Sequence, residues 1–291
     1  MQPAALSPTH LVTTRERLRS ELAAVRSAGR TIGLVPTMGA LHKGHVSLAE
    51  ASRRECDFTV ATVFVNPAQF GPRDDYQRYP RTLDADLAAL AEVGVDLVFA
   101  PDVDEVYRPG HATHIEVRGP AEPLEGRFRP GHFRGVATVV LKLFNLIMPD
   151  RAYFGQKDYQ QSLVIRRMVD DLDLPVEIRI GPIVREPDGL AMSSRNAYLT
   201  ARQREQALLL NRSLRRAAEL VAAGQRHAQV VLADVRSLFA AAPDVRLEYF
   251  VLADPETLQE VERIDRETLA AVAAWVGTTR LIDNLVIGHE S

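Results

Sequence analysis

The stretch TIGLVPTMGALHKGHVSLAEASRREC, residues 31–56, combines an apolar β-rich run, a glycine-broken loop and the pattern of a helix. We expect a strand over residues 31–37, a loop over residues 38–44 and a helix from residue 45. In open parallel sheets, ligands bind at the carboxyl ends of strands, where helices begin. The stretch therefore predicts a strand–loop–helix unit with a ligand site in its loop.

The same alternation continues up to about residue 184, where apolar runs typical of buried strands alternate with helical patterns. This order predicts βαβ units, and therefore a Rossmann-like α/β fold: a doubly wound parallel sheet with helices on both faces. The expected strands also include residues 58–65, 95–101, 151–155 and 175–184, and the expected helices include residues 15–29, 82–94, 135–148 and 158–172.

The composition changes near residue 184, and a smaller C-terminal α+β domain is expected beyond it. A long helix is predicted there, with Thr200 and Gln203 in capping-box spacing and Gly224 as its stop. A second helix and three strands follow. We expect two domains, residues 1–184 and residues 185–291, the second with helices over 200–224 and 229–242 and strands near 245–254, 269–277 and 279–287.

The composition excludes several classes of protein. The 291 residues carry a formal net charge of −3, and a pI near 6.3 gives no general attraction to nucleic acid or anionic membrane. Cys56 is the only cysteine, which excludes an intrachain disulfide and a four-cysteine zinc site and fits a reducing compartment. No run reaches the roughly 18 apolar residues of a membrane span. We therefore expect a cytoplasmic protein with neither nucleic acid nor membrane as a partner.

His42 and His45 stand three residues apart at the end of the loop, and three explanations of the pair are open. A phosphate group fits best, because Gly39 and Gly44 let the backbone approach an anion and a helix start offers unpaired N–H groups. A zinc ion would need a third ligand from elsewhere. Hydrogen bonds to a helix cap or within the core would explain either histidine singly.

Motifs outside this loop sharpen the interpretation. His111 and His114 repeat the histidine spacing, so spacing alone is weak evidence, and neither G-x-x-x-x-G-K-[ST] nor G-x-G-x-x-G occurs. H-x-G-H after a first strand is the signature of the adenylating nucleotidyltransferases, in which a second motif closes over the triphosphate. AMSSRN, residues 191–196, occupies the place expected for that motif, although taken alone it is explained by a Ser/Asn turn.

Six motifs taken together are far more specific than any one of them, and with them the chain resembles the pantothenate synthetase (pantoate–β-alanine ligase) family. The resemblance runs over essentially the whole chain, including AAWVGTTRLIDN at residues 273–284. The motifs, in order, are VPTMGALHKGH (35–45), FVNPAQF (64–70), YPRTLDADL (79–87), RPGHFRGVATVVLKLFN (129–145), FGQKDYQQ (154–161) and DGLAMSSRNAYLT (188–200).

The resemblance implies ATP-dependent ligation of pantoate and β-alanine through a pantoyl adenylate, with Mg²⁺ as the accompanying ion, its ligands unidentified, and a homodimer. His45 is implied to be the catalytic acid, with His42 and Lys157 also catalytic. Gln69 and Gln161 are implied to hold pantoate, and Gln69 also borders β-alanine. The residues implied to bind ATP are Met38, Gly39, Ala40, Leu41, His42, Lys43, Gly44, His45, Gly155, Gln156, Lys157, Asp158, Val184, Met192, Ser193, Ser194 and Arg195.

The resemblance also assigns roles to larger segments. Residues 1–184 are expected to bind ATP and pantoate, and residues 185–291 to act as a lid. Residues 125–135 are rich in basic side chains and glycine, which suits a mobile flap over the site and equally a solvated loop. Gln156 departs from the family, which normally has glutamate there, so any charge-based role of this position is in doubt.

Two other functions remain open. One is a different H-x-G-H nucleotidyltransferase, such as a phosphopantetheine adenylyltransferase, which would lack the paired glutamines. The other is a non-catalytic metal-binding module built from His42, His45, His111 and His114. A tRNA ligase is disfavoured by the acidic charge balance.

Overall fold

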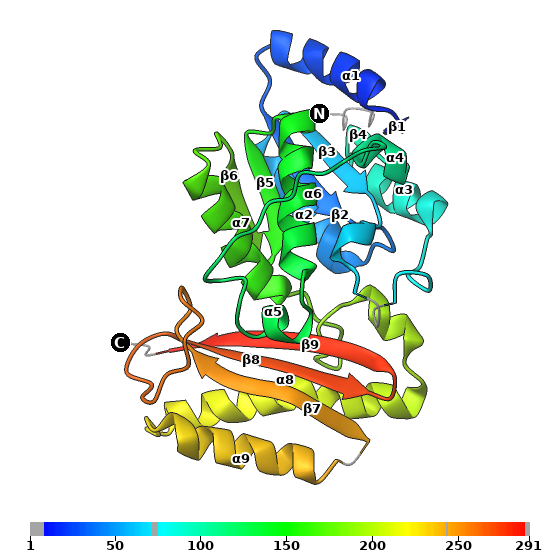
Figure 1. Cartoon of the computed structure of the whole chain (residues 1–291). Coiled ribbons are helices and arrows are strands. Elements are labelled where there is room, and N and C mark those ends of the chain that lie inside the picture. Colours follow the sequence, from blue (N-terminus) through cyan, green and yellow to red (C-terminus); the bar gives the residue numbers. More distant parts are fainter. Residues whose placement is uncertain (1–8, 72–74, 243, 289–291) are drawn as a thin grey trace, which may run out of the picture. The chain divides into compact units, whose positions relative to one another are not determined.

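The computed structural model describes residues 9–71, 75–242 and 244–288 (Figure 1). Within these ranges, no helix combines the length and the apolar character needed to cross a membrane. The chain divides into two compact units, each with its own hydrophobic core.

The first unit contains the described residues up to Gln156, together with Gln161–Pro182, and the second contains Lys157–Gln160 and the described residues from Ile183 onward. All described residues after Pro182 therefore belong to the second unit. The short segment Lys157–Gln160, which comes earlier in the sequence, belongs to the second unit as well. The domain division expected after residue 184 and the lid role of the second domain stay predictions.

A parallel sheet of six strands forms the centre of the first unit, in the order β1-β4-β3-β2-β5-β6. From β2 the chain builds outward through β3 and β4 on one side and later through β5 and β6 on the other. The winding thus reverses between β2 and β5, and doubly wound sheets bind ligands at the carboxyl ends of such strands. The predicted fold class is confirmed. The strands are β1 His10–Val12, β2 Ile32–Thr37, β3 Phe58–Val63, β4 Leu97–Phe99, β5 Arg151–Gly155 and β6 Glu177–Gly181.

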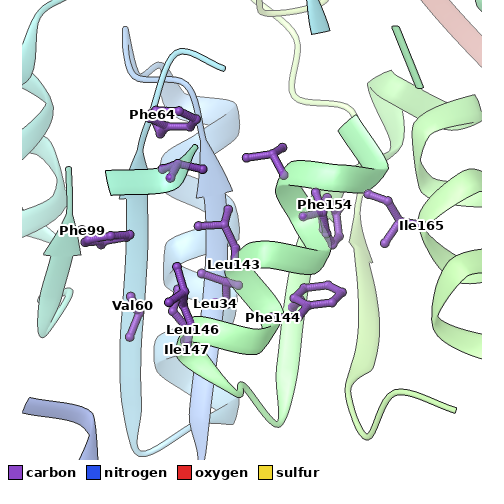
Figure 2. Close-up of a cluster of buried hydrophobic side chains, with 14 of the residues drawn as sticks. Leu34, Val60, Phe64, Phe99, Leu143, Phe144, Leu146, Ile147, Phe154 and Ile165 are labelled. Carbon is purple, nitrogen blue, oxygen red and sulfur yellow. The ribbon is translucent and has the colours of Figure 1, made fainter. Parts of the chain in front are cut away.

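Helices cover both faces of this sheet. Successive strand residues point to opposite faces, and their side chains are buried in a different hydrophobic core on each face. Leu34 and Val60 lie in the core formed with α1, α6 and α7, which Figure 2 shows, whereas Val35 and Ala61 lie in the core formed with α2 and α3. This burial on both faces explains the unbroken apolar runs in the sequence. The helices are α1 Arg15–Ser27, α2 Lys43–Glu55, α3 Leu83–Glu92, α4 Val103–Val106, α5 Glu125–Phe128, α6 His132–Ile147 and α7 Tyr159–Asp171, with 3₁₀ turns η1 Pro67–Gln69 and η2 Gln156–Asp158.

Three short elements are absent from the sequence prediction. Strand β1 has three residues, of which Leu11 is exposed and Val12 is buried, and it pairs only with β4. Helices α4 and α5 have four residues each, which is about one turn. Elements of this length show no hydrophobic period, so no sequence pattern indicates them.

The second unit is a layer of two helices on an antiparallel sheet of order β7-β8-β9. The predicted capping box of α8 is present: Thr200 Oγ1 accepts from Gln203 N at 3.3 Å, and Gln203 Oε1 accepts from Thr200 N at 3.0 Å. Gly224 ends the helix with φ +93°, as expected for its stop. The elements are η3 Ser194–Tyr198, α8 Ala201–Ala222, α9 Ala228–Ala240, β7 Val245–Ala253, β8 Thr268–Val276 and β9 Thr279–Ile287.

Candidate active site

The loop after β2 is held in place by hydrogen bonds to its backbone. Gly39 (φ +82°) and Ala40 (φ +49°) both adopt left-handed conformations. The Thr37 hydroxyl accepts from Gly39 N at 3.1 Å, and the Asp86 carboxylate accepts from Ala40 N at 3.0 Å and Leu41 N at 2.8 Å. Asp86 is only 2% exposed, so these charge-assisted bonds are shielded from water. No local pattern of the sequence points to this role of Asp86, which is marked only by its place in the YPRTLDADL motif.

His42 and His45 together cap the N-terminus of α2. His42 Nδ1 accepts from Gly44 N at 3.1 Å, and His45 Nδ1 accepts from His42 N at 3.3 Å. The helix consequently begins at Lys43 rather than at residue 45, because the His42 ring supplies the first cap. The helix-cap explanation is therefore confirmed for both Nδ1 atoms.

This capping also determines what the two rings can do for a ligand. A neutral imidazole that accepts at Nδ1 carries its proton on Nε2, which is then a hydrogen-bond donor. The ring centroids of His42 and His45 lie 4.1 Å apart, so both donors belong to one small region at a helix N-terminus. Such a region suits an anion such as phosphate, and the cap and phosphate explanations are compatible.

Gln69 ends η1, the short turn that follows β3, and its side-chain amide is oriented by Asn66. Asn66 Nδ2 donates to Gln69 Oε1 at 2.9 Å and to Gly135 O at 3.1 Å. Gln69 Nε2 donates to Met38 Sδ at 3.2 Å, so Gln69 lies beside the loop that follows β2. Asn66 is 1% exposed and is a functional candidate that sequence analysis missed, although FVNPAQF contains it.

Two further predicted residues lie at or after the end of β5, the neighbour of β2 at the reversal of winding. Gly155 is the last residue of β5, and Gln161 lies in the first turn of α7. Both are half-buried. The carboxyl ends of neighbouring strands in the first unit thus carry the histidine loop, Gln69 and Gly155, and Gln161 follows shortly after.

Lys157 and Asp158 belong to the second unit, where β9 holds their backbone. Asn284 Nδ2 donates to Lys157 O at 2.9 Å, and Asn284 is 3% exposed. The Lys157 side chain is half-buried and that of Asp158 is exposed. No local pattern of the sequence points to this role of Asn284, because its partner is far away along the chain.

The segment that carries Val184 and Met192 folds back on itself within the second unit. Met192 N donates to Val184 O at 3.0 Å. The Arg185 guanidinium donates to the two oxygens of the buried Asp283 carboxylate at 2.7 and 3.0 Å. Two adjacent residues of β9, Asp283 and Asn284, therefore anchor both this segment and the backbone of Lys157.

Ser193, Ser194 and Arg195 form the entry to η3 rather than a plain turn. Ser193 is the N-cap of this 3₁₀ helix, and its Oγ accepts from Arg195 N at 3.3 Å. Asn196 Nδ2 donates to Glu186 Oε1 at 3.0 Å, which ties the motif to the segment before it. The sequence AMSSRN thus adopts a defined, hydrogen-bonded shape.

Comparisons with known proteins show the family of this chain. The sequence model described as "Pantoate-beta-alanine ligase" matches residues 10–286. The chain belongs to the pantoate–β-alanine ligase family. A pantothenate synthetase from Moorella thermoacetica is 54% identical over 277 residues, which cover 95% of this chain and 98% of that protein.

Solved structures of the family have the same fold. The crystal structure of pantothenate synthetase from Thermus thermophilus gives a TM-score of 0.91 at 48% identity, covering 95% of this chain and 99% of that one. The pantoate–β-alanine ligase from Francisella tularensis, solved in complex with β,γ-ATP and β-alanine, gives 0.76 at 33% identity, covering 96% and 97%. The family predicted from the six motifs is therefore confirmed.

The second histidine pair does not form a metal centre with the first. The His111 ring lies 5.5 Å from that of His114 and 5.0 Å from that of Tyr107, between centroids. In the described part of the chain, no group of three or more His, Cys, Asp or Glu side chains could hold a metal ion. The four histidines therefore provide no four-ligand module of the kind left open by the sequence.

Residues 125–135 contain α5 and the first turn of α6 and lie against the segment that carries Gln69. His132 Nδ1 is 2.9 Å from Gln69 O. A Cβ atom on Gly135 would lie 2.2 Å from Ala68 O, so only glycine permits this approach of α6 to η1. In this family member the segment is thus partly helical and packed; its mobility stays a prediction.

Proposed function

We propose that the chain ligates pantoate to β-alanine in two steps carried out by the residues described above. The pantoate carboxylate attacks the α-phosphorus of ATP, which forms pantoyl adenylate and releases pyrophosphate. The β-alanine amine then attacks the acyl carbon, which forms the amide of pantothenate and releases AMP. The observation that carries the proposal is the anchored loop of residues 39–45 beside Gln69, in a chain of the pantoate–β-alanine ligase family.

ATP is a substrate, and we propose that its phosphates bind to the loop of residues 38–45. The positive end of the α2 dipole, together with the Nε2–H donors of His42 and His45, supplies positive potential where charge develops on the bridging oxygen. His45 acts as the acid of the first step. Such preorganised donors stabilise the transition state strongly, because they need no rearrangement during the reaction.

We propose that residues of the second unit bind the same nucleotide, as the family resemblance implies. Lys157 and Arg195 supply positive charge for the departing pyrophosphate. The Val184 backbone contacts adenine. The remaining ATP-binding residues of this proposal are Gly155, Gln156, Asp158, Met192, Ser193 and Ser194.

Gln69 and Gln161 are proposed to hold pantoate, and Gln69 also to border β-alanine. The pantoate carboxylate is already a nucleophile, so the site needs no general base for the first step. Its hydroxyl groups need neutral partners, and a glutamine amide binds a hydroxyl without ionising it.

Mg²⁺ is the proposed accompanying ion, and it would neutralise charge on the triphosphate. Mg²⁺ is usually held by one or two carboxylates, substrate phosphates and water rather than by a protein cage. The lack of a cluster of three or more such ligands among the described residues is compatible with this mode of binding.

We also propose that the protein forms a homodimer and works in the cytoplasm, where ATP is available. Light scattering after size-exclusion chromatography measures the oligomeric state.

The deciding experiment is a set of assays with ATP, pantoate and β-alanine, each omitted in turn. We expect pyrophosphate from ATP and pantoate alone, and AMP and pantothenate only when β-alanine is added. A phosphopantetheine adenylyltransferase would instead release pyrophosphate with phosphopantetheine. Pyrophosphate release that does not depend on pantoate would contradict the proposed function.

A further inference from the structure

Tyr107, at the end of α4, reaches the residues that orient Gln69. Its hydroxyl donates to Asn66 Oδ1 at 2.8 Å. Burial raises the pKa of Tyr107 to about 12, so the hydroxyl keeps its proton at neutral pH. It therefore remains a donor to Asn66 under the conditions in which the protein works.

The side-chain amide of Asn66 is fully engaged, which leaves it one orientation. Its Oδ1 accepts from Tyr107 and from Ala68 N at 3.2 Å, and its Nδ2 donates to Gly135 O and to Gln69 Oε1. The backbone N–H can only donate and the backbone carbonyl can only accept, so a rotated amide would lose both bonds. At 1% exposure, water cannot replace them.

The orientation of Asn66 in turn determines that of Gln69. Because Asn66 presents its NH₂ group, Gln69 must present Oε1 to it and turn Nε2 away. Nε2 lies against Met38 Sδ, which is a weak acceptor that a ligand oxygen can displace.

We propose that Tyr107 is a positioning residue for pantoate: acting through Asn66, it holds the Gln69 amide so that its NH₂ group donates to a substrate oxygen. The proposal rests on the proposed role of Gln69 in binding pantoate. It predicts that the hydrogen-bonded series Tyr107–Asn66–Gln69 selects ligands that place an acceptor oxygen beside Gln69 Nε2.

The test compares Tyr107→Phe with Tyr153→Phe. Phenylalanine at 107 keeps the ring contacts with Phe64 and Lys142 and removes only the hydroxyl. Tyr153 is suited as a control, because its buried hydroxyl donates to Glu55 Oε2 at 3.1 Å rather than to Asn66 or Gln69. We expect Tyr107→Phe to raise KM for pantoate by about three- to tenfold with KM for ATP unchanged. Tyr153→Phe should lower Tm without changing either KM.

Gln69→Ala and the double variant separate the possible failures. Gln69→Ala should itself raise KM for pantoate; if it does not, the proposed pantoate site is wrong. If it does, Tyr107→Phe should add no further loss in the Gln69→Ala background, because it acts through the missing amide. The positioning role would be overturned if Tyr107→Phe raised KM for pantoate by the same factor in the natural chain and in the Gln69→Ala variant. It would also be overturned if Tyr107→Phe, like Tyr153→Phe, lowered Tm without changing either KM.

Discussion

His45 serves the helix and the proposed chemistry with different atoms of one ring. Its Nδ1 accepts from His42 N, and its Nε2 is the proposed donor to phosphate. We expect His45→Ala to slow single-turnover adenylate formation by about a hundredfold to a thousandfold, since one preorganised donor is lost. The lost cap should cost only about 0.5–2 kcal/mol of stability.

The variant His45→Gln separates these two functions. A glutamine at the third helical position can return a side-chain acceptor to the N-cap N–H. It should restore most of the melting temperature but not the rate of adenylate formation. A rate restored together with the melting temperature would show that His45 acts only as a cap.

Asp86 is expected to control ATP binding through the backbone of Ala40 and Leu41. In Asp86→Asn one of these N–H groups must face an NH₂ group, and an unsatisfied buried donor costs about 1–3 kcal/mol. We expect KM for ATP to rise by about tenfold and Tm to fall. Steady-state kinetics with ATP varied at saturating pantoate measure the effect.

Asp96→Asn is the matched control for this prediction. Asp96 also accepts from a backbone N–H, that of Thr59 at 2.8 Å, but it stands directly before β4 and its partner lies near the start of β3. Its replacement should lower Tm and leave KM for ATP unchanged. If both variants raise KM for ATP equally, loop anchoring by Asp86 is not the cause.

Among the elements, β9 organises the segments of the second unit that are proposed to bind ATP. Asn284 holds the carbonyl of Lys157, and Asp283 holds Arg185. We expect Asn284→Ala to slow adenylate formation by about tenfold, because Lys157 loses the bond that fixes its backbone. Single-turnover kinetics at saturating ATP measure this change.

Ser213→Ala controls for the loss of a buried hydrogen bond in the same unit. Ser213 is fully buried, and its hydroxyl donates to Leu210 O at 2.7 Å within α8. This variant should lose stability without a change in the rate. An Asn284→Ala enzyme with normal adenylate formation would contradict the role of β9.

At the scale of the whole molecule, arginine-bonded carboxylates occur in both units. A hydrogen bond from the Arg15 backbone holds the pKa of Glu105 below its usual value, and hydrogen bonds from the Arg204 side chain do the same for Glu186. A carboxyl group with a lowered folded-state pKa stabilises the fold at pH values above its unfolded pKa. This stabilisation is lost as the pH falls through the folded pKa.

We therefore expect acidification to lower Tm, and Glu186→Gln to reduce the pH dependence. The difference in Tm between the natural chain and this variant should be full above the usual glutamate pKa of 4.5 and should shrink in more acidic solution. Melting curves at a series of pH values give this difference. A difference that is constant with pH would show that the Glu186 charge does not stabilise the fold.

The fold class, the family and several element ends follow from local patterns in the sequence. Strand 58–63 is buried on both faces because it lies between two helical layers, and its largely apolar run predicts a parallel sheet. Thr200 and Gln203 predict the start of α8 because a capping box involves only neighbouring residues. The six ordered motifs predict the family because each is a contiguous stretch that can be recognised without knowing the fold.

The side chains that support the predicted site residues are found from the folded chain and not from its sequence. Asp86 meets the backbone of Ala40, Tyr107 meets Asn66, and Asn284 meets Lys157 across 127 residues of chain. The reason is physical: a helix or strand period depends on neighbours along the chain, whereas these hydrogen bonds join groups brought together by packing of the sheet and its helices. Local patterns carry no information about such partners.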